Sequence, residues 1–257
     1  MTLKYFKLQN MSKKRTDIDR RQFFKTGAIA VGSLAIVGIG AEYLKSKKKD
    51  EIPSINFLRP PGAIDENIFV SECIKCGLCV QICPIQAIKL ADIDSGLDYG
   101  TPYIEVRSQA CDFSCDAVQC VLACPTGSLS HTIVKKEDVR MGLARVAKPE
   151  ACLASQGLGF KGLARGADFN GLLRYAKIDR WNPIPVREHP YDLELCDLCV
   201  RECPIENAIS LQSIDNEGKR KMPVIKEACV GCGVCEMMCP VEPSVIVIDE
   251  RKMWGKA

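Results

Sequence analysis

Residues 73–84 read CIKCGLCVQICP, and residues 229–240 read CVGCGVCEMMCP. Both follow the pattern C-x2-C-x2-C-x3-C-P, in which three closely spaced cysteines precede a fourth that is followed by proline. Three thiolates at this spacing can bind corners of one iron–sulfur cube, and the fourth cysteine then ligates a second cube. A zinc site would instead need two C-x2-C pairs separated by a connecting segment. The repeated pattern therefore predicts [4Fe–4S] clusters.

Two further cysteine groups are less regular. Residues 111–125 read CDFSCDAVQCVLACP, and residues 196–204 read CDLCVRECP, which is one cysteine short. We interpret Cys152, alone upstream, as the displaced first ligand of the third group. The alternative is a three-cysteine site, with Cys152 unligated or with Asp192 or His189 in its place. The predicted ligands of four [4Fe–4S] clusters are Cys73, Cys76, Cys79, Cys83, Cys111, Cys115, Cys120, Cys124, Cys152, Cys196, Cys199, Cys203, Cys229, Cys232, Cys235 and Cys239.

The amino-acid sequence between the cysteine groups repeats as well. Short apolar segments flank a polar turn between the first and second groups and again between the third and fourth, which predicts a β-hairpin in each place. The residues after each Cys-Pro are expected to form one helical turn that leads into a strand. Each pair of groups around a hairpin is then one two-cluster ferredoxin unit, and two such units stand in tandem. The fold class is therefore α+β.

The predicted domain boundaries follow from these units. The first two-cluster unit covers 66–135 and the second covers 136–257, with an insertion at about 158–195 that loops out on the surface. We expect this insertion to be a partner-docking surface. It begins near a G-x-G-x-x-G match at 157–162, but no apolar strand precedes that match, so a dinucleotide site is not predicted. Residues 51–65 are expected to be a linker.

The N-terminal 1–50 have the features of an export leader. Arg20 and Arg21 precede Phe23 and Phe24, and an uncharged apolar run of fifteen residues follows at 27–41. This resembles a twin-arginine signal, which directs export of an already folded protein, and the expected location is the periplasm. Fifteen residues are fewer than the roughly 20 that cross a bilayer. The alternative is an uncleaved leader that tethers the protein to the membrane as a short N-terminal anchor helix.

Charge and composition exclude several classes of protein. The net charge of +3 comes from the leader, because residues 50–257 carry 23 basic and 29 acidic residues, a net of −6. A nucleic-acid binder would show a basic domain, so nucleic acid is not an expected partner. The 47% apolar content excludes wholesale disorder. The two histidines, His131 and His189, are read as ordinary loop residues.

The pairing of the groups follows the rule for two-cluster ferredoxins. The three leading cysteines of the first group are assigned to one cluster with Cys124, and those of the second group to another with Cys83. In the same way Cys239 completes the third set and Cys203 the fourth. Pairing the outer groups together and the inner groups together is the alternative, because a hairpin-like stretch also lies between the second and third groups.

These features together resemble the NapG/MauM family of ferredoxin-type proteins, which keep the lone first cysteine of the third motif. The chain departs from the family in a longer third-motif gap and in three residues between Cys111 and Cys115, where two are usual. Local agreement lies in Cys76-Gly77-Leu78-Cys79, Gly100-Thr101-Pro102, Arg140-Met141-Gly142-Leu143, Cys152-Leu153, Gln156-Gly157 and Cys196-Asp197-Leu198-Cys199.

The resemblance implies an electron-transfer subunit with no catalytic site and no small-molecule substrate. Its partners are expected to be a membrane quinol-oxidising iron–sulfur protein of the NapH type, a periplasmic reductase or cytochrome c acceptor, and the twin-arginine translocase during export. Nitrate reductase is the first expectation for the acceptor and nitrous-oxide reductase the second. The other readings are an iron–sulfur enzyme with a labile cluster at the third site, a structural protein held together by clusters, and a disulfide scaffold.

Overall fold

The computed structural model describes residues 57–115, 117–175, 178–179 and 182–255. These residues belong to one compact unit, Ile55–Ala257, distinct from Met1–Ser54. The predicted leader at 1–50 and residues 51–56 of the predicted linker lie outside the described residues. Residues 57–65 of the linker are described, and Leu58 and Arg59 among them are buried. Within the described part of the chain, every helix is too short or too polar to cross a bilayer.

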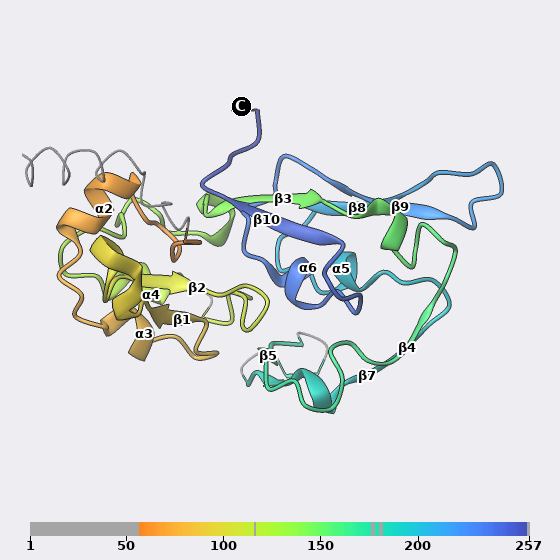
Figure 1. The fold of residues 1–257 in the computed structure, drawn as a ribbon, viewed down its shortest axis with the longest axis horizontal. Coiled ribbons are helices and arrows are strands. Elements are labelled where there is room, and N and C mark those ends of the chain that lie inside the picture. Colours follow the sequence, from red (N-terminus) through yellow and green to blue (C-terminus); the bar gives the residue numbers. More distant parts are fainter. Residues whose placement is uncertain (1–56, 116, 176–177, 180–181, 256–257) are drawn as a thin grey trace, which may run out of the picture. The chain divides into compact units, whose positions relative to one another are not determined.

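The first half of the unit is built around a short antiparallel hairpin. Strand β1 (Ile88–Leu90) pairs with β2 (Pro102–Ile104), which confirms the hairpin predicted between the first two cysteine groups. Isolated bridges join Leu58 to Ile104 and Ala63 to Leu129. The other elements of this half, shown in Figure 1, are α2 (Glu66–Glu72), α3 (Leu78–Gln81), the 3-10 helix η1 (Ile93–Asp98) and α4 (Gln119–Leu122).

Outside the insertion, the second half contains two antiparallel pairs. Strand β8 (Ile209–Ser213) pairs with β9 (Lys221–Ile225), which confirms the second predicted hairpin. Strand β3 (Gly142–Val146) pairs with the last strand, β10 (Ile246–Glu250). The stretch between Cys124 and Cys152 contributes only β3, which pairs with β10, so it forms no hairpin of its own. This removes the ground for the outer-with-outer pairing. This half also contains η2 (Lys136–Asp138), η3 (Pro149–Ala151), α5 (Leu198–Arg201) and α6 (Val234–Met237).

The predicted helical turn lies on the other side of each Cys-Pro. Helices α3, α4, α5 and α6 each end two residues before the cysteine that precedes proline. In the first and third groups the residues after proline form a turn in which Gln86 (φ 53°) and Asn207 (φ 59°) are left-handed. A right-handed helix cannot continue through such residues. The prediction of a helical turn after Cys-Pro is therefore wrong at these two groups.

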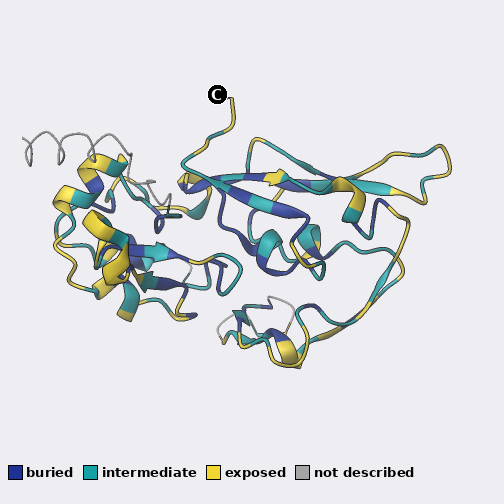
Figure 2. Ribbon diagram, in the orientation of Figure 1, coloured by how far each residue is buried: buried dark blue, intermediate teal, exposed yellow. Residues whose placement is uncertain are grey.

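The insertion is an ordered part of the fold, so the expectation that it loops out on the surface is also wrong. Strand β4 (Phe160–Leu163) pairs with β7 (Pro190–Leu193), and β5 (Leu172–Leu173) pairs with β6 (Ile184–Pro185), followed by the 3-10 helix η4 (Val186–Glu188). Five of its side chains are buried: Ala164, Leu173, Tyr175, Val186 and Tyr191. Figure 2 colours the whole ribbon by burial, with buried residues in dark blue.

The glycine-rich match at the start of the insertion serves strand pairing. A Cβ atom on Gly159 would lie 2.1 Å from the Leu193 carbonyl oxygen, so only glycine permits this close approach between the two chain segments. The match is followed by β4, which pairs with β7, and by no helix. This context does not support a dinucleotide site.

A buried arginine holds the first half of the unit together. The Arg59 side chain is 1% exposed, and its guanidinium lies 5.0 Å from the centroid of the Phe69 ring. It donates hydrogen bonds to the Thr101 hydroxyl at 2.8 Å and to the carboxylates of Asp98 at 2.5 Å and Glu66 at 2.8 Å. The buried positive charge of Arg59 is therefore paired with two carboxylates, one from α2 and one from η1.

Candidate iron–sulfur sites

Four predicted ligands line one cavity in the first half of the unit. Cys73, Cys76 and Cys79 come from the loop that enters α3, and Cys124 follows α4. Helices α3 and α4 pack against each other, which brings the fourth cysteine of the second group to the first. These are the four cysteines that the spacing assigned to the first cluster. Their role as ligands stays a prediction.

The second half contains two more cavities of this kind. One is lined by the lone Cys152 together with Cys196, Cys199 and Cys239. The other is lined by Cys203, Cys229, Cys232 and Cys235. Each set takes one cysteine from the partner group, as the two-cluster rule requires. The other three lie at the start of one helical turn in the fourth set, whereas in the third set Cys152 comes from after η3.

The rival ligands of the third site lie elsewhere. The Asp192 carboxylate accepts a hydrogen bond from Lys161 at 2.6 Å on an exposed strand edge. The His189 ring stacks on Tyr175, with ring centroids 4.1 Å apart. Neither residue lines the cavity that contains Cys152, so the structure contradicts their substitution for it.

The remaining four cysteines are linked by their mutual electrostatic effects. Burial raises the pKa of Cys120 to about 12, and the neighbouring Cys115 and Cys83 add to this increase. Burial likewise raises the pKa of Cys111 well above its usual range, with Cys120 the next largest cause. The second set, Cys83, Cys111, Cys115 and Cys120, stays a prediction from the spacing, and the mutual effects of Cys83, Cys115 and Cys120 agree with it.

The donor chemistry of these sets fits an iron–sulfur cluster. Burial and the neighbouring Cys73 thiol raise the pKa of Cys79 to about 11, and burial raises the pKa of Cys196 to about 11. Thiolates crowded in this way ionise only when a bound cation compensates their charge. All sixteen cysteines lie within the described residues and are free of disulfides. No group of three or more ligating side chains in the described part converges as one metal ion would require.

The backbone around the sets repeats with the cysteines. Gly77 (φ 75°), Val118 (φ 46°) and Gly233 (φ 91°) each precede a one-turn helix in left-handed conformation. Such residues turn successive backbone N–H groups towards one concavity, where they can bind an anionic centre. At the equivalent position of the third group Asp197 has φ −124°. The three left-handed turns therefore favour a negatively charged cluster at their sites.

Several sulfur atoms have hydrogen-bond partners that would tune a bound cluster. Backbone N–H groups of Ala87 and Val245 donate to Cys83 Sγ at 3.4 Å and Cys239 Sγ at 3.5 Å. Ser128 Oγ lies 3.3 Å from Cys124 Sγ. Although burial opposes ionisation, the hydrogen bond with Ser128 and further bonds in the same loop lower the pKa of Cys124 to about 7. The first set thus has one thiol that is already close to ionisation.

Ser128→Ala is expected to lower one midpoint potential of the iron-loaded protein. A hydrogen bond to a ligand sulfur favours the more negative, reduced state of a cluster, so its loss disfavours reduction. An anaerobic redox titration followed by electron paramagnetic resonance should show one shifted couple and the others unchanged. Ser130→Ala is the control, because Ser130 bonds Thr132 and no sulfur. Identical titrations for both variants would contradict a role of Ser128 at the first set.

The two halves of the unit meet at the second and fourth cysteine groups. The backbone N–H of Cys111 donates to the carbonyl oxygen of Cys232 at 3.3 Å. Arg107 donates to the carbonyl oxygens of Cys239 at 2.9 Å and Val241 at 2.9 Å, at the end of α6. The insertion also holds this segment, through bonds of Leu172 with the Gln109 amide. Spacing did not predict this junction, because its contacts come from residues outside the repeat.

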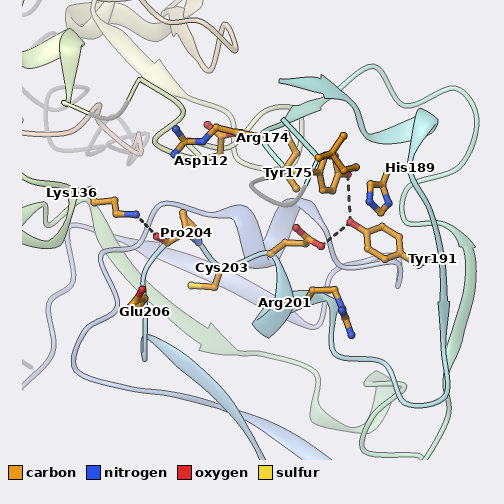
Figure 3. A pocket seen from close by; sticks show the side chains of 13 residues that line it. Asp112, Lys136, Arg174, Tyr175, His189, Tyr191, Arg201, Cys203, Pro204 and Glu206 are labelled. Carbon is orange, nitrogen blue, oxygen red and sulfur yellow. Dashed lines mark hydrogen bonds between the residues drawn. The ribbon is translucent and has the colours of Figure 1, made fainter. Parts of the chain in front are cut away.

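A separate cavity of about 450 Å³ lies beside Cys203 and was not predicted from the sequence (Figure 3). The Tyr191 hydroxyl donates to Glu202 Oε1 at 3.0 Å and lies 3.4 Å from the Tyr175 hydroxyl. Burial raises the pKa of Tyr175 to about 12 and that of Glu202 above its usual range. These residues come from the insertion and from the turn after α5. No sequence pattern indicates that these two segments lie close together. The cavity shows that the insertion packs against the fourth set.

Comparison with known proteins agrees with the geometry. Residues 72–128 and 194–242 each match the 4Fe-4S dicluster domain family. The chain is similar to the ferredoxin-type protein NapG of Escherichia coli, with 37% identity over 89% of this chain and 84% of the relative. It is also similar to two methylamine utilization ferredoxin-type proteins MauM. The protein of Methylobacillus flagellatus is 33% identical over 91% of this chain and 85% of the relative. The protein of Paracoccus denitrificans is 32% identical over 93% of this chain and 91% of the relative. No solved structure matches the chain.

Proposed function

From the premise that the chain belongs to the family of NapG and MauM ferredoxin-type iron–sulfur electron-transfer proteins, we propose that it is a four-cluster electron relay. It carries electrons from a membrane quinol-oxidising protein of the NapH type to a periplasmic terminal reductase or its cytochrome c. Nitrate reductase is the first candidate for the acceptor. The chain itself has no catalytic role in this proposal.

One observation carries the proposal. Twelve of the sixteen cysteines line three separate cavities, four cysteines to each cavity, and the spacing assigns the other four to a further set. A [4Fe–4S] cluster held by four thiolates exchanges one electron, and its surroundings set its potential. The chain's own residues supply the thiolates, the hydrogen bonds to sulfur and the apolar shell around each set.

The proposed location is the periplasm. Support comes from the paired arginines and the apolar run of the leader, which resemble a twin-arginine signal. Export of a folded protein would let the thiolates keep a cluster inserted in the cytoplasm, where disulfides are rare. An uncleaved leader would tether the protein to the periplasmic face of the inner membrane.

A second candidate for the pathway follows from the relatives. Proteins named for methylamine utilization match this chain over a similar share of its length as the NapG proteins do. In that case the same relay would serve methylamine utilization in place of nitrate reduction. Growth of a deletion strain on nitrate without oxygen, and separately on methylamine, distinguishes the two pathways.

Anaerobically purified protein is expected to contain about sixteen iron and about sixteen acid-labile sulfide per chain, as four cubanes require. Electron paramagnetic resonance during a redox titration should then show reversible one-electron couples without substrate turnover. About fifteen iron would indicate a three-iron centre at one site and favour the enzyme reading. Little iron together with oxidised thiols would contradict the relay.

A further inference from the structure

Exposed apolar side chains occur within the first cysteine group and in the strand and 3-10 helix that follow it. We define the docking face by six of them, which are 42–85% exposed: Ile74, Leu78, Ile82, Leu90, Ile93 and Leu97. Three of the six, Ile74, Leu78 and Leu90, also line the cavity formed by the first set. Cys76 of that set is itself exposed. Large exposed apolar patches on a protein surface mark interaction sites.

The same motif positions are buried in the fourth group. Ile74, Leu78 and Ile82 are 63%, 42% and 42% exposed. Their counterparts in the fourth group, by position relative to the cysteines, are 1%, 0% and 0% exposed: Val230, Val234 and Met238. The motif is the same, so its exposure in the first group reflects a missing neighbour.

Two neighbours cover the fourth group: the start of β3, where the Met141 N–H bonds the Val230 carbonyl oxygen, and the loop after β2 in the first half. A Cβ atom on Gly233 would lie 2.5 Å from a methyl group of Val106, whereas a Cβ atom on the equivalent Gly77 would meet nothing within 4 Å. Beside Val106, Arg107 donates to the Cys239 carbonyl at 2.9 Å. This face of the motif is therefore covered by an apolar side chain with an adjacent basic one.

The charges around the docking face favour a partner of the same kind. Glu72, Asp92 and Asp94 are exposed and adjoin the face, and none is in an ion pair among the described residues. Lys75 is the one exposed basic residue within the described stretch 72–94 that has no carboxylate partner, and its ammonium lies 6.0 Å from the Tyr99 ring. An acidic edge repels an anionic lipid surface and attracts lysine or arginine.

We propose that the docking face binds a redox partner protein whose contact surface is apolar at its centre and basic at its edge. Such a partner would cover the first set as Val106 and Arg107 cover the fourth. The proposal rests on the relay function, because it makes this face the place where one end of the relay meets its partner.

Leu97→Arg tests the proposal, since Leu97 is 85% exposed and lies away from the cysteines in sequence. The arginine removes apolar contact and repels a basic partner. Using the iron-loaded full chain, two rates are measured: its reduction by quinol-energised membrane vesicles of the source organism, and its reoxidation by the periplasmic fraction. We expect at least one of the two rates to be tenfold or more lower for Leu97→Arg than for the wild type. In the wild type the same rate should fall when salt is added, because salt screens the attraction between the acidic edge and a basic partner.

Two further variants make the result decisive. Leu78→Arg places the same charge within the face and should slow the same step. Ile214→Arg, at a residue 47% exposed in the turn after β8, is the matched control and should slow neither. All variants are compared at equal iron content and after dithionite reduction. Unchanged rates for Leu97→Arg and Leu78→Arg overturn the docking face. If the vesicles do not reduce the wild type and the periplasmic fraction does not reoxidise it, the relay function is overturned instead.

The other occupants of an apolar face give separate outcomes. Binding of the wild type, but not of Leu97→Arg, to protein-free vesicles of phosphatidylethanolamine and phosphatidylglycerol would show a lipid ligand and overturn the proposal. A wild-type dimer in sedimentation velocity that Leu97→Arg converts to a monomer would show self-association and also overturn it. We expect a monomer and no vesicle binding for both proteins.

Discussion

Cys152→Ser is expected to lose a quarter of the iron, from about sixteen to about twelve atoms per chain, because one cubane of four cannot assemble without its fourth thiolate. In the structure Cys152 is 8% exposed and lines one cavity with Cys196, Cys199 and Cys239. Iron and sulfide analysis of the anaerobically purified variant measures the loss directly. Electron paramagnetic resonance of the reduced protein should show one signal fewer.

Asp192→Asn is the control for this loss. Its carboxylate lies on the exposed edge of β7 and pairs with Lys161, so its removal should leave the iron content unchanged. A full complement of iron in Cys152→Ser would mean that the lone cysteine is not a ligand. A deficit in Asp192→Asn would restore the oxygen-ligand reading of the third site.

Arg59→Ala is expected to destabilise the iron-loaded protein by about 3–5 kcal/mol, the cost of leaving a buried charge without its partner. Asp98 would lose its only ion-pair partner in the described residues, whereas Glu66 would keep Arg251. The packing of the guanidinium on Phe69 would be lost as well. The variant should also release its clusters faster on heating, since the first set lies in this half of the unit.

Unfolding by guanidinium chloride under argon measures the change in the free energy of unfolding. It is followed by both circular dichroism and cluster absorbance. Arg145→Ala is the matched control, because Arg145 is 55% exposed and pairs with Asp249 on the surface. Surface ion pairs contribute little to stability. We expect unfolding of this control to coincide with the wild type. Equal unfolding midpoints for Arg59→Ala and the wild type would refute the structural role of the buried arginine.

The repeat made the local fold predictable. Both hairpins, Ile88–Ile104 and Ile209–Ile225, follow from apolar alternation on either side of a polar turn between cysteine groups. The pairing of β3 with β10 did not follow, because about a hundred residues separate the two strands and no local pattern records which distant edge a strand will meet. The helical turn was misplaced because the apolar residues after Cys-Pro fit a helix or a turn equally well.

The candidate sites divide in the same way. The two-cluster rule, applied to the cysteine spacing, predicted the three sets that line common cavities. Spacing alone did not place the distant Cys152, which was assigned to the third set as the cysteine left over and through the family resemblance. The contacts that join the halves could not be read from the sequence. Val106 and Arg107 look like any strand end and surface cation, and their burial against Gly233 and α6 depends on tertiary packing.

The pairing of β3 with the final strand also determines when the protein can finish folding. The first hairpin can form while the chain is still on the ribosome, because its strands are close in sequence. The second half cannot close until β10, about a hundred residues after β3, has emerged. Arg251 extends this dependence, since its backbone N–H bonds the Met141 carbonyl and its guanidinium donates to the Ile64 carbonyl. A chain released before β10 and Arg251 are made would lack the strand pairing of the second half and the bond from Arg251 to Ile64 in the first.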